Sequence, residues 1–222
     1  MTSRPEDYRF NTATAGFPFE AVDVAPNLPG GGRSITSYDE HDRAIEVRVY
    51  DANGELINRA VRIYDEQGRV SEERQIVDDI ERLIPSEARA QMLKESGLSA
   101  DELRQELRAQ LTKLMGGQRE PYSVSYRYDA FGRVNHMHRR IFNHEDDIQT
   151  TYNQNGDAES EVTLSKVQAE PNTPSPPSYS EVHYSYQYDQ HQNWTEQSIS
   201  WRSSPDGAFQ PSTQMKRTLE YY

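Results

Sequence analysis

The sequence predicts a mainly β fold: an antiparallel meander of hairpins forming a curved sheet, with an inserted helical segment packed on one face. Three observations predict it. A short turn motif recurs along the chain, segments with alternating tyrosines flank its copies, and one stretch near the middle has helical periodicity instead. Successive hairpins with short turns give each strand an antiparallel neighbour.

The recurring motif is Tyr-Asp-x-x-Gly-x-aliphatic, which appears as YDANGEL (50–56), YDEQGRV (64–70) and YDAFGRV (128–134). The Asp carboxylate suits the start of a type I turn because it accepts N–H bonds from the backbone just ahead. Gly supplies the left-handed conformation from which the second strand leaves with a bulge. The motif therefore predicts hairpin tips whose structural turn residues are Asp51, Gly54, Asp65, Gly68, Asp129 and Gly132.

Three degenerate copies are YDEHDRA (38–44), YNQNGDA (152–158) and YDQHQNW (188–194). Asp42 and Gln192 stand at the glycine position in two of them. Asp tolerates positive φ better than Gln does. For the last copy an alternative is therefore a turn shifted by one residue, with Asn193 in the left-handed position.

The strands are predicted from alternation with a period of two, which is typical of half-buried antiparallel strands. In the segment 122–128, for example, Tyr and Val alternate with Ser and Arg. The expected strands span about 34–38, 43–51, 55–65, 69–78, 120–129, 133–144, 147–153, 157–166, 180–189, 193–203 and 214–222.

Residues 79–117 break this alternation and are predicted to be helical. A first helix starts near Ile76 and ends at Pro85, and a second is capped by Ser86 and stopped by Gly97. Ser99–Glu102 form a capping box that opens a third helix. Its apolar stripe needs a partner, for which the tyrosine-rich face of the sheet is expected; the stripe consists of Leu103, Leu107, Leu111, Leu114 and Met115.

Composition sets limits on the fold and on the partners. Roughly a third of the 222 residues are apolar, against roughly 45–50% in ordinary globular chains, yet aromatic residues make up 10%. We therefore expect a folded chain with a thin core: an irregular N-terminal arm over 1–33 and a single domain over 34–222. With a net charge of −12, the chain is expected to have no nucleic-acid partner. Neither a membrane-spanning run nor a secretory signal is recognisable.

The repeated motif resembles the YD repeats of the Rhs (rearrangement hot spot), wall-associated and teneurin group, over about residues 38–78 and 120–200. The resemblance implies consecutive hairpins that wind into a curled sheet, which in large members closes into a shell around a toxin or other cargo. It also implies a secreted or cell-envelope protein. This chain has too few copies to close a shell by itself, and it carries a helical insertion.

Aromatic residues are the candidate binding residues. Tyrosines and a tryptophan that alternate along the predicted strands would form either a stacking platform for sugars or peptides or structural cross-strand pairs. The structural interpretation is favoured. The residues concerned are Tyr126, Tyr128, Tyr184, Tyr186, Tyr188 and Trp201.

Histidines are the candidate metal ligands. His136 and His138 are two residues apart and share one face of a strand, with His144 and a run of carboxylates just beyond. Neighbouring arginines disfavour a bound cation, so surface hydrogen bonding is the favoured interpretation. No cofactor is expected, because the common nucleotide and hydrolase motifs are absent.

These observations favour a non-catalytic structural scaffold or binding module, with a carbohydrate or a protein as its ligand. The alternatives are a metal-dependent enzyme with a site between helices and sheet, and a partial shell of a polymorphic-toxin system. The edges of an open meander are also expected to be able to associate, for example by pairing of Tyr221–Tyr222 with another copy.

Overall fold

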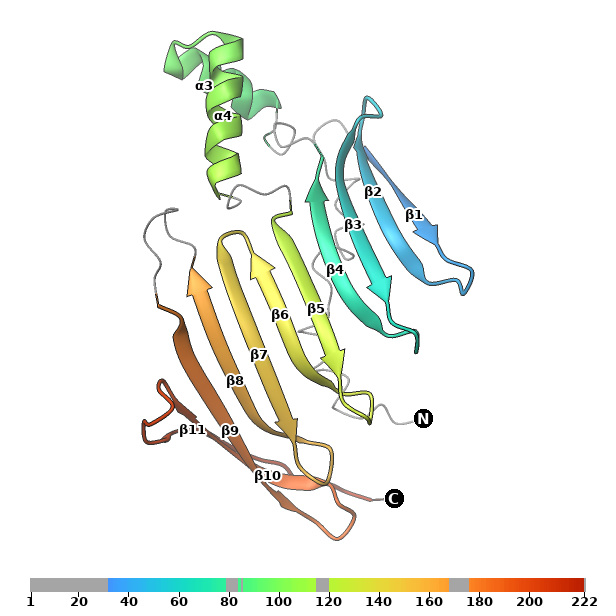
Figure 1. Cartoon of the computed structure of the whole chain (residues 1–222), viewed down its shortest axis with the longest axis vertical. Helices are drawn as coiled ribbons and strands as arrows, with labels where there is room; N and C mark the ends of the chain where they lie inside the picture. Colours follow the sequence, from blue (N-terminus) through green and yellow to red (C-terminus); the bar gives the residue numbers. More distant parts are fainter. Residues whose placement is uncertain (1–31, 79–83, 85, 115–119, 168–175, 222) are drawn as a thin grey trace. The chain divides into compact units, whose positions relative to one another are not determined.

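The computed structural model describes residues 32–78, 84, 86–114, 120–167 and 176–221. Over these residues, eleven strands form one sheet in which each strand neighbours the next in chain order, as Figure 1 shows. This confirms the predicted antiparallel meander with a helical insertion.

The element bounds follow the expected segments closely in most places. The strands are β1 (Gly32–Tyr38), β2 (Ala44–Asp51), β3 (Leu56–Tyr64), β4 (Val70–Val77), β5 (Tyr122–Tyr128), β6 (Val134–Ile141), β7 (His144–Tyr152), β8 (Ala158–Val167), β9 (Ser178–Tyr188), β10 (Trp194–Arg202) and β11 (Gln210–Lys216). The helices are α3 (Ser86–Ser96) and α4 (Ala100–Leu114).

Contacts between residues divide the chain into two compact units. One unit contains β1 to β4 and both helices, and the other contains β7 to β11 with most of β5 and β6. Of the expected N-terminal arm, residues 1–31 lie outside the described residues, whereas Gly32 and Arg33 belong to β1.

Left-handed residues sit at the same place in every tip. Gly54, Gly68, Gly132 and Gly156 have φ between 78° and 89°, and Asp42 and Gln192 have φ of 58° and 61°. The alternative of a shifted last turn is therefore wrong, since Gln192 and not Asn193 takes the left-handed conformation. Strand register shifts beside the tyrosine of each motif for which pairing is described, as a bulge at that position requires.

Two of these glycines make a matched pair for mutation. Both Gly68→Ala and Gly54→Ala should lower the free energy of unfolding by about 1–2 kcal/mol, because an L-residue is strained in the left-handed region. Gly68→Ala should cost about 0.5–1 kcal/mol more, because the new Cβ would push Arg43 away from the Tyr64 ring. This is the free energy of an exposed cation–π contact. A Cβ at position 68 would lie 2.9 Å from Arg43 Nη1, whereas one at position 54 meets nothing within 4 Å. Urea unfolding of the two variants measures both effects, and equal losses would contradict the second.

Three expectations about element bounds are wrong. Ile76 and Val77 end strand β4 and do not start a helix; residues 79–83 of that expected helix lie outside the described residues. The β6–β7 turn falls two or three residues early, because Phe142 adopts a left-handed φ of 55° that no glycine or proline announces. The last strand begins at Gln210 and ends at Lys216, so the terminal residues 217–221 lie beyond it.

The helical insertion begins with caps that the sequence encodes. At the start of α4, Ser99 N–H donates to Glu102 Oε2 at 2.9 Å and Glu102 N–H donates to Ser99 Oγ at 3.3 Å. The Ser99 hydroxyl and N–H lower the pKa of Glu102. Leu103 and Leu107 of α4 line a shallow depression together with Leu93 of α3, and the two helices contact each other. Packing of this pair on a face of the sheet stays an expectation.

One face of strands β2 to β4 carries four buried apolar side chains, those of Val47, Val49, Ala60 and Val77. Val47 pairs with Ala60, and Val49 pairs with Asn58, which in turn pairs with Val77. Residues paired across strands share a face, so these apolar side chains form one buried layer. Glu73 lies on this same face and is only 1% exposed, paired with Arg62 directly opposite on β3.

In the other unit, one face of strands β7 to β10 carries most of the tyrosines, and we call it the tyrosine face. Register places five positions on it: Ile148 of β7, Thr163 of β8, and Tyr184, Tyr186 and Gln197 of β9 and β10. Ile148 and Gln197 are buried there. Asp146 shares this face because it lies two residues before Ile148, and it too is buried.

Candidate functional site

Each hairpin tip is held by the first carboxylate or amide of its motif. In the Asp39 tip, Oδ1 accepts the N–H groups of His41 and Arg43 at 2.9 and 3.0 Å, and Oδ2 accepts Arg43 Nε at 2.8 Å. Asp65 and Asp129 make the same contacts with the arginine four residues on. The repeated aspartates are therefore committed to the turn and do not project as free acids.

Asn153 shows that the charge is dispensable for the turn itself. Its Oδ1 accepts the N–H groups of Asn155 and Asp157 at 2.9 and 3.1 Å, as the aspartates do in the other tips. The charge adds attraction for an arginine where one follows the glycine position.

These bonds shift the acidity of the tips. Burial alone would raise the pKa of Asp39, but the N–H groups of Arg43 and His41 and the Arg43 guanidinium outweigh it and lower that pKa to about 2. The same balance lowers the pKa of Asp65 and Asp129, with Arg69 and Arg133 as partners. For Asp189, the Tyr221 hydroxyl contributes most to the lowered pKa.

Acid should therefore destabilise the sheet. A carboxyl whose pKa is lower in the folded than in the unfolded chain stabilises the fold above the unfolded value of about 4 and stops doing so as the pH falls through the folded value. We expect the melting temperature to fall as the pH drops from 4 toward 2. Asp39→Asn should flatten this dependence because Asn keeps the two backbone bonds. Melting followed by circular dichroism at several pH values tests this, with the exposed Asp206→Asn as control; an unchanged acid slope in Asp39→Asn would contradict it.

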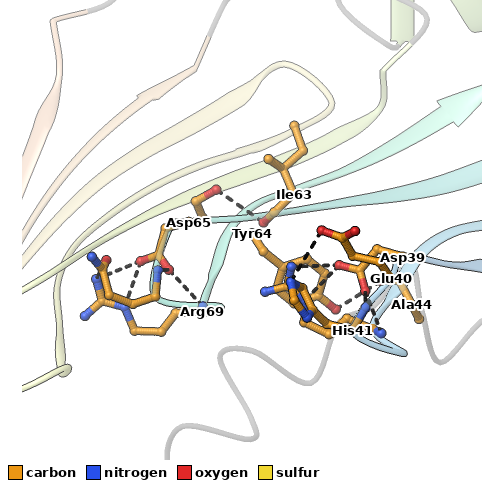
Figure 2. Close-up of polar contacts among 11 residues, drawn as sticks. Asp39, Glu40, His41, Ala44, Ile63, Tyr64, Asp65 and Arg69 are labelled. Carbon is orange, nitrogen blue, oxygen red and sulfur yellow. Dashed lines mark hydrogen bonds and ion pairs between the residues drawn. The ribbon is translucent and has the colours of Figure 1, made fainter.

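Neighbouring tips are also joined to one another, as Figure 2 shows for the Asp39 and Asp65 tips. Arg43 of the first tip lies over the Tyr64 ring, with its Cζ 4.4 Å from the ring centroid. The Tyr64 hydroxyl reaches past it and donates to the carbonyl of Ala44 at 3.0 Å. Tyr64, which opens the motif between β3 and β4, thus closes over the tip between β1 and β2.

The same joint recurs in the second unit. Arg133 lies over Tyr152, whose hydroxyl donates to the carbonyl of Val134 at 2.6 Å. Further along, Tyr186 donates to the carbonyl of Ala158, and Arg217 donates to that of Trp194. In all four cases the acceptor is the first residue of the strand that leaves the tip. We call this carbonyl the tip carbonyl.

Most of the candidate binding tyrosines are occupied by such structural contacts. Tyr186 bonds the tip carbonyl and accepts from Gln197, and Tyr188 donates to Asp157 at 2.6 Å. Burial and the Asp157 carboxylate raise the pKa of Tyr188 to about 12. Tyr184 is half-buried, and Tyr126 is only 5% exposed, so the Tyr126 ring is not presented to a ligand.

Trp201 differs from these tyrosines because it is 43% exposed. It pairs with Val182 on the tyrosine face, and Val182 pairs with Glu161, which pairs with Thr150. These four residues form one row across strands β7 to β10, which we call the Trp201 row. With strands about 4.8 Å apart, Trp201 and Glu161 are separated by roughly 10 Å.

Glu161 was not among the residues singled out from the sequence. Burial raises the pKa of its carboxyl, opposed by the charge of Arg139. Its carboxylate makes no hydrogen bond or ion pair with any residue that the structure describes. Only the register shows that it shares a row with Trp201, so sequence alone gave no signal for it.

The candidate metal ligands are divided between the two faces. His136 Nε2 lies 2.9 Å from Asp147 Oδ2, and His138 Nδ1 lies 3.8 Å from the same oxygen. His144 pairs instead with Asp146 at 2.8 Å. Because adjacent strand residues project to opposite faces, Asp146 and Asp147 hold their histidines apart. In the described part of the chain, no group of three or more histidines, cysteines and carboxylates is arranged to hold a metal ion.

His136 also borders a hollow in the second unit. This open hollow of about 360 Å³ is lined by Arg127, Tyr128, Asn135, His136 and Gln149. Asn135 Oδ1 is buried there without a hydrogen-bond partner. Tyr128, a candidate binding residue, is half-buried and is part of this wall.

Comparison with known proteins adds no family. The scan against protein-family models finds no match to this chain, and neither does the search of curated proteins. Neither helix that the structure describes is long and apolar enough to cross a membrane.

Proposed function

We propose that this chain is a non-catalytic scaffold of YD-repeat type that binds a carbohydrate through the Trp201 row. The observation that carries the proposal is the exposure of Trp201 on a face where the neighbouring tyrosines are held by structural bonds. An exposed indole beside a sheet of hydroxyl-bearing side chains is suited to stacking against a sugar ring.

Glu161 and the hydroxyl-bearing residues favour a carbohydrate over a peptide. Glu161 has no bond to a described residue, and the hydroxyl of Thr150 lies next to it in the row. A carboxyl group and hydroxyls beyond an aromatic ring can bond the hydroxyls of a sugar stacked on that ring. The second unit thus holds a polar and an aromatic contact on one surface, separated by about the width of two strands.

The scaffold part of the proposal rests on the tips. Their aspartates, arginines and tyrosines bond one another and the backbone, so the recurrent residues of the chain serve to hold hairpins together. The proposed scaffold is of the YD-repeat kind that the motif resembles, and the proposed location is the one that this resemblance implies, outside the cell or in the cell envelope.

A screen of the purified chain against glycans and peptides tests the proposal. Trp201→Ala should abolish binding of a glycan hit while the melting temperature stays within a few degrees, and Glu161→Gln should weaken it. The matched control is Phe209→Ala, since Phe209 is exposed to a similar extent and contacts His183 and Arg202 on the opposite face. Binding of peptides alone would replace the carbohydrate with a protein ligand. A large loss of stability in Trp201→Ala would leave only a structural role for this residue.

A further inference from the structure

Tyr38 occupies the position of a tyrosine that closes over a neighbouring tip, but no tip in the described part of the chain lies beside it. It occupies the same place in its motif as Tyr64 and Tyr152, just beyond the register shift and paired with the first residue of the next strand. Tyr64 and Tyr152 are half-buried and bonded to a tip carbonyl. Tyr38 is 60% exposed, and its hydroxyl bonds no residue that the structure describes.

The reason lies in the position of β1. Tyr64 on β3 reaches the tip carbonyl of β2, the preceding strand in the sheet. For Tyr38 the corresponding acceptor would begin a strand paired with the outer side of β1. Within the described ranges, β1 pairs with β2 alone.

Within β1 itself, the side chains that usually protect an edge strand are missing. Natural edge strands are commonly blocked by proline, lysine or bulges. β1 has the sequence GRSITSY, with neither proline nor lysine, and Ile35 is exposed on it. Its one charge, on Arg33, lies over the Tyr50 ring of the neighbouring strand. The opposite edge strand, β11, carries Pro211 and Lys216.

We propose that the outer edge of β1 binds a β-hairpin of another polypeptide whose tip has the sequence Asp-x-x-Gly-Arg. The strand that leaves this tip would pair antiparallel with β1. Its arginine would lie over the Tyr38 ring, and its tip carbonyl would accept the Tyr38 hydroxyl. Main-chain bonds along the strand give affinity, and Tyr38 gives register.

A second copy of this chain does not fit the requirement. The strands that leave the tips after β1, β3, β5, β7 and β9 are β2, β4, β6, β8 and β10. Each of these strands already has a neighbour on each side. Two β1 strands could pair antiparallel, but Tyr38 would then lie at the far end from the partner's tip. The tyrosine at the other terminus is also engaged, because Tyr221 bonds Asp189 and Asn193 of its own chain. The expected pairing of Tyr221–Tyr222 with another copy stays a prediction.

The test uses a hairpin of the required kind taken from the chain itself. A fluorescently labelled peptide of residues 122–141, which contains the Asp129 tip and Arg133, is titrated with the full chain and followed by anisotropy. The full chain should bind it, and Tyr38→Phe should weaken binding about three- to tenfold, the value of one hydrogen bond. A peptide carrying Arg133→Ser should bind more weakly than the parent. Tyr221→Phe serves as the matched control and should leave binding unchanged.

Stability measurements separate this role from a structural one. Tyr38→Phe should leave the melting temperature unchanged, whereas Tyr64→Phe should lower it, because only Tyr64 has a tip carbonyl within its own chain. Several results would overturn the inference: no peptide binding, equal affinity for Tyr38→Phe, or self-association of the chain that Tyr38→Ala abolishes. The Trp201 row takes no part in this experiment, so its outcome is independent of the proposed carbohydrate site.

Discussion

Arg62→Met is expected to lower the free energy of unfolding by about 3–5 kcal/mol, because it removes the guanidinium that is paired with the buried Glu73 carboxylate. Arg62 Nε donates to Glu73 Oε1 at 2.6 Å, and the Glu73 side chain is 1% exposed. Burial lowers the pKa of Arg62, but the attraction of Glu73 outweighs it and raises that pKa above the usual range. Urea unfolding monitored by fluorescence measures the loss.

A second variant shows whether the loss comes from the uncompensated charge. In Arg62→Met/Glu73→Leu both charges are replaced by apolar side chains on a face that already carries Val47 and Ala60. Such replacements of buried ion pairs are often neutral or stabilising, so this variant should recover most of the stability. If the double variant is as unstable as the single one, the pair contributes through packing, and the expectation is wrong.

Asp146→Ala is expected to lower the free energy of unfolding by about 1.5–3 kcal/mol at pH 7, the range for hydrogen bonds to a charged group. The buried Asp146 carboxylate accepts from Arg139 Nη2 at 2.6 Å, from Ser165 Oγ at 2.6 Å, and lies 2.8 Å from His144 Nε2. Burial would raise the pKa of Asp146, but Ser165, Arg139 and His144 together lower it.

The pH dependence of this loss has a definite sign. Because the pKa of Asp146 is lowered in the folded chain, its contribution is present above about pH 4 and is lost as the pH falls through the folded value. The difference between the variant and the parent should therefore shrink in acid. Asp147→Ala is the matched control: it is the next residue on β7, its side chain is 37% exposed, and loss of its pairing with His136 should cost only about 0–1 kcal/mol. Equal losses at the two positions would contradict the assignment of Asp146 to the buried face.

The turns could be predicted because their chemistry lies within a few adjacent residues. Each turn depends on an aspartate whose carboxylate accepts the N–H groups two and four residues ahead, and on a residue at positive φ between them. Both features can be recognised without information from the rest of the chain. The Phe142 turn escaped prediction because a bulky residue takes the left-handed position there. Local sequence carries no sign of such a turn.

The joints between tips could not be predicted in the same way. Tyr64 and Ala44 are 20 residues apart, and their bond depends on which hairpins lie side by side. The motif itself did not indicate that Arg43 and Arg133 each cover a tyrosine of the next hairpin. For the candidate site, the aromatic pattern identified Trp201, but only register could add Glu161 or reveal that Tyr186 is committed to a tip carbonyl.

The two kinds of connection in this sheet should differ in their tolerance of engineering. Tips with the repeated bonding plan join the strands β1–β2, β2–β3, β3–β4, β5–β6, β7–β8 and β9–β10. By contrast, the helices lie between β4 and β5, and residues 168–177 lie between β8 and β9. Foreign domains or new chain termini introduced at those second connections would leave the bonds within and between the tips of each unit intact. Circular permutants opened there should fold, whereas those opened within a tip should lose the bonds that this tip makes with its neighbours.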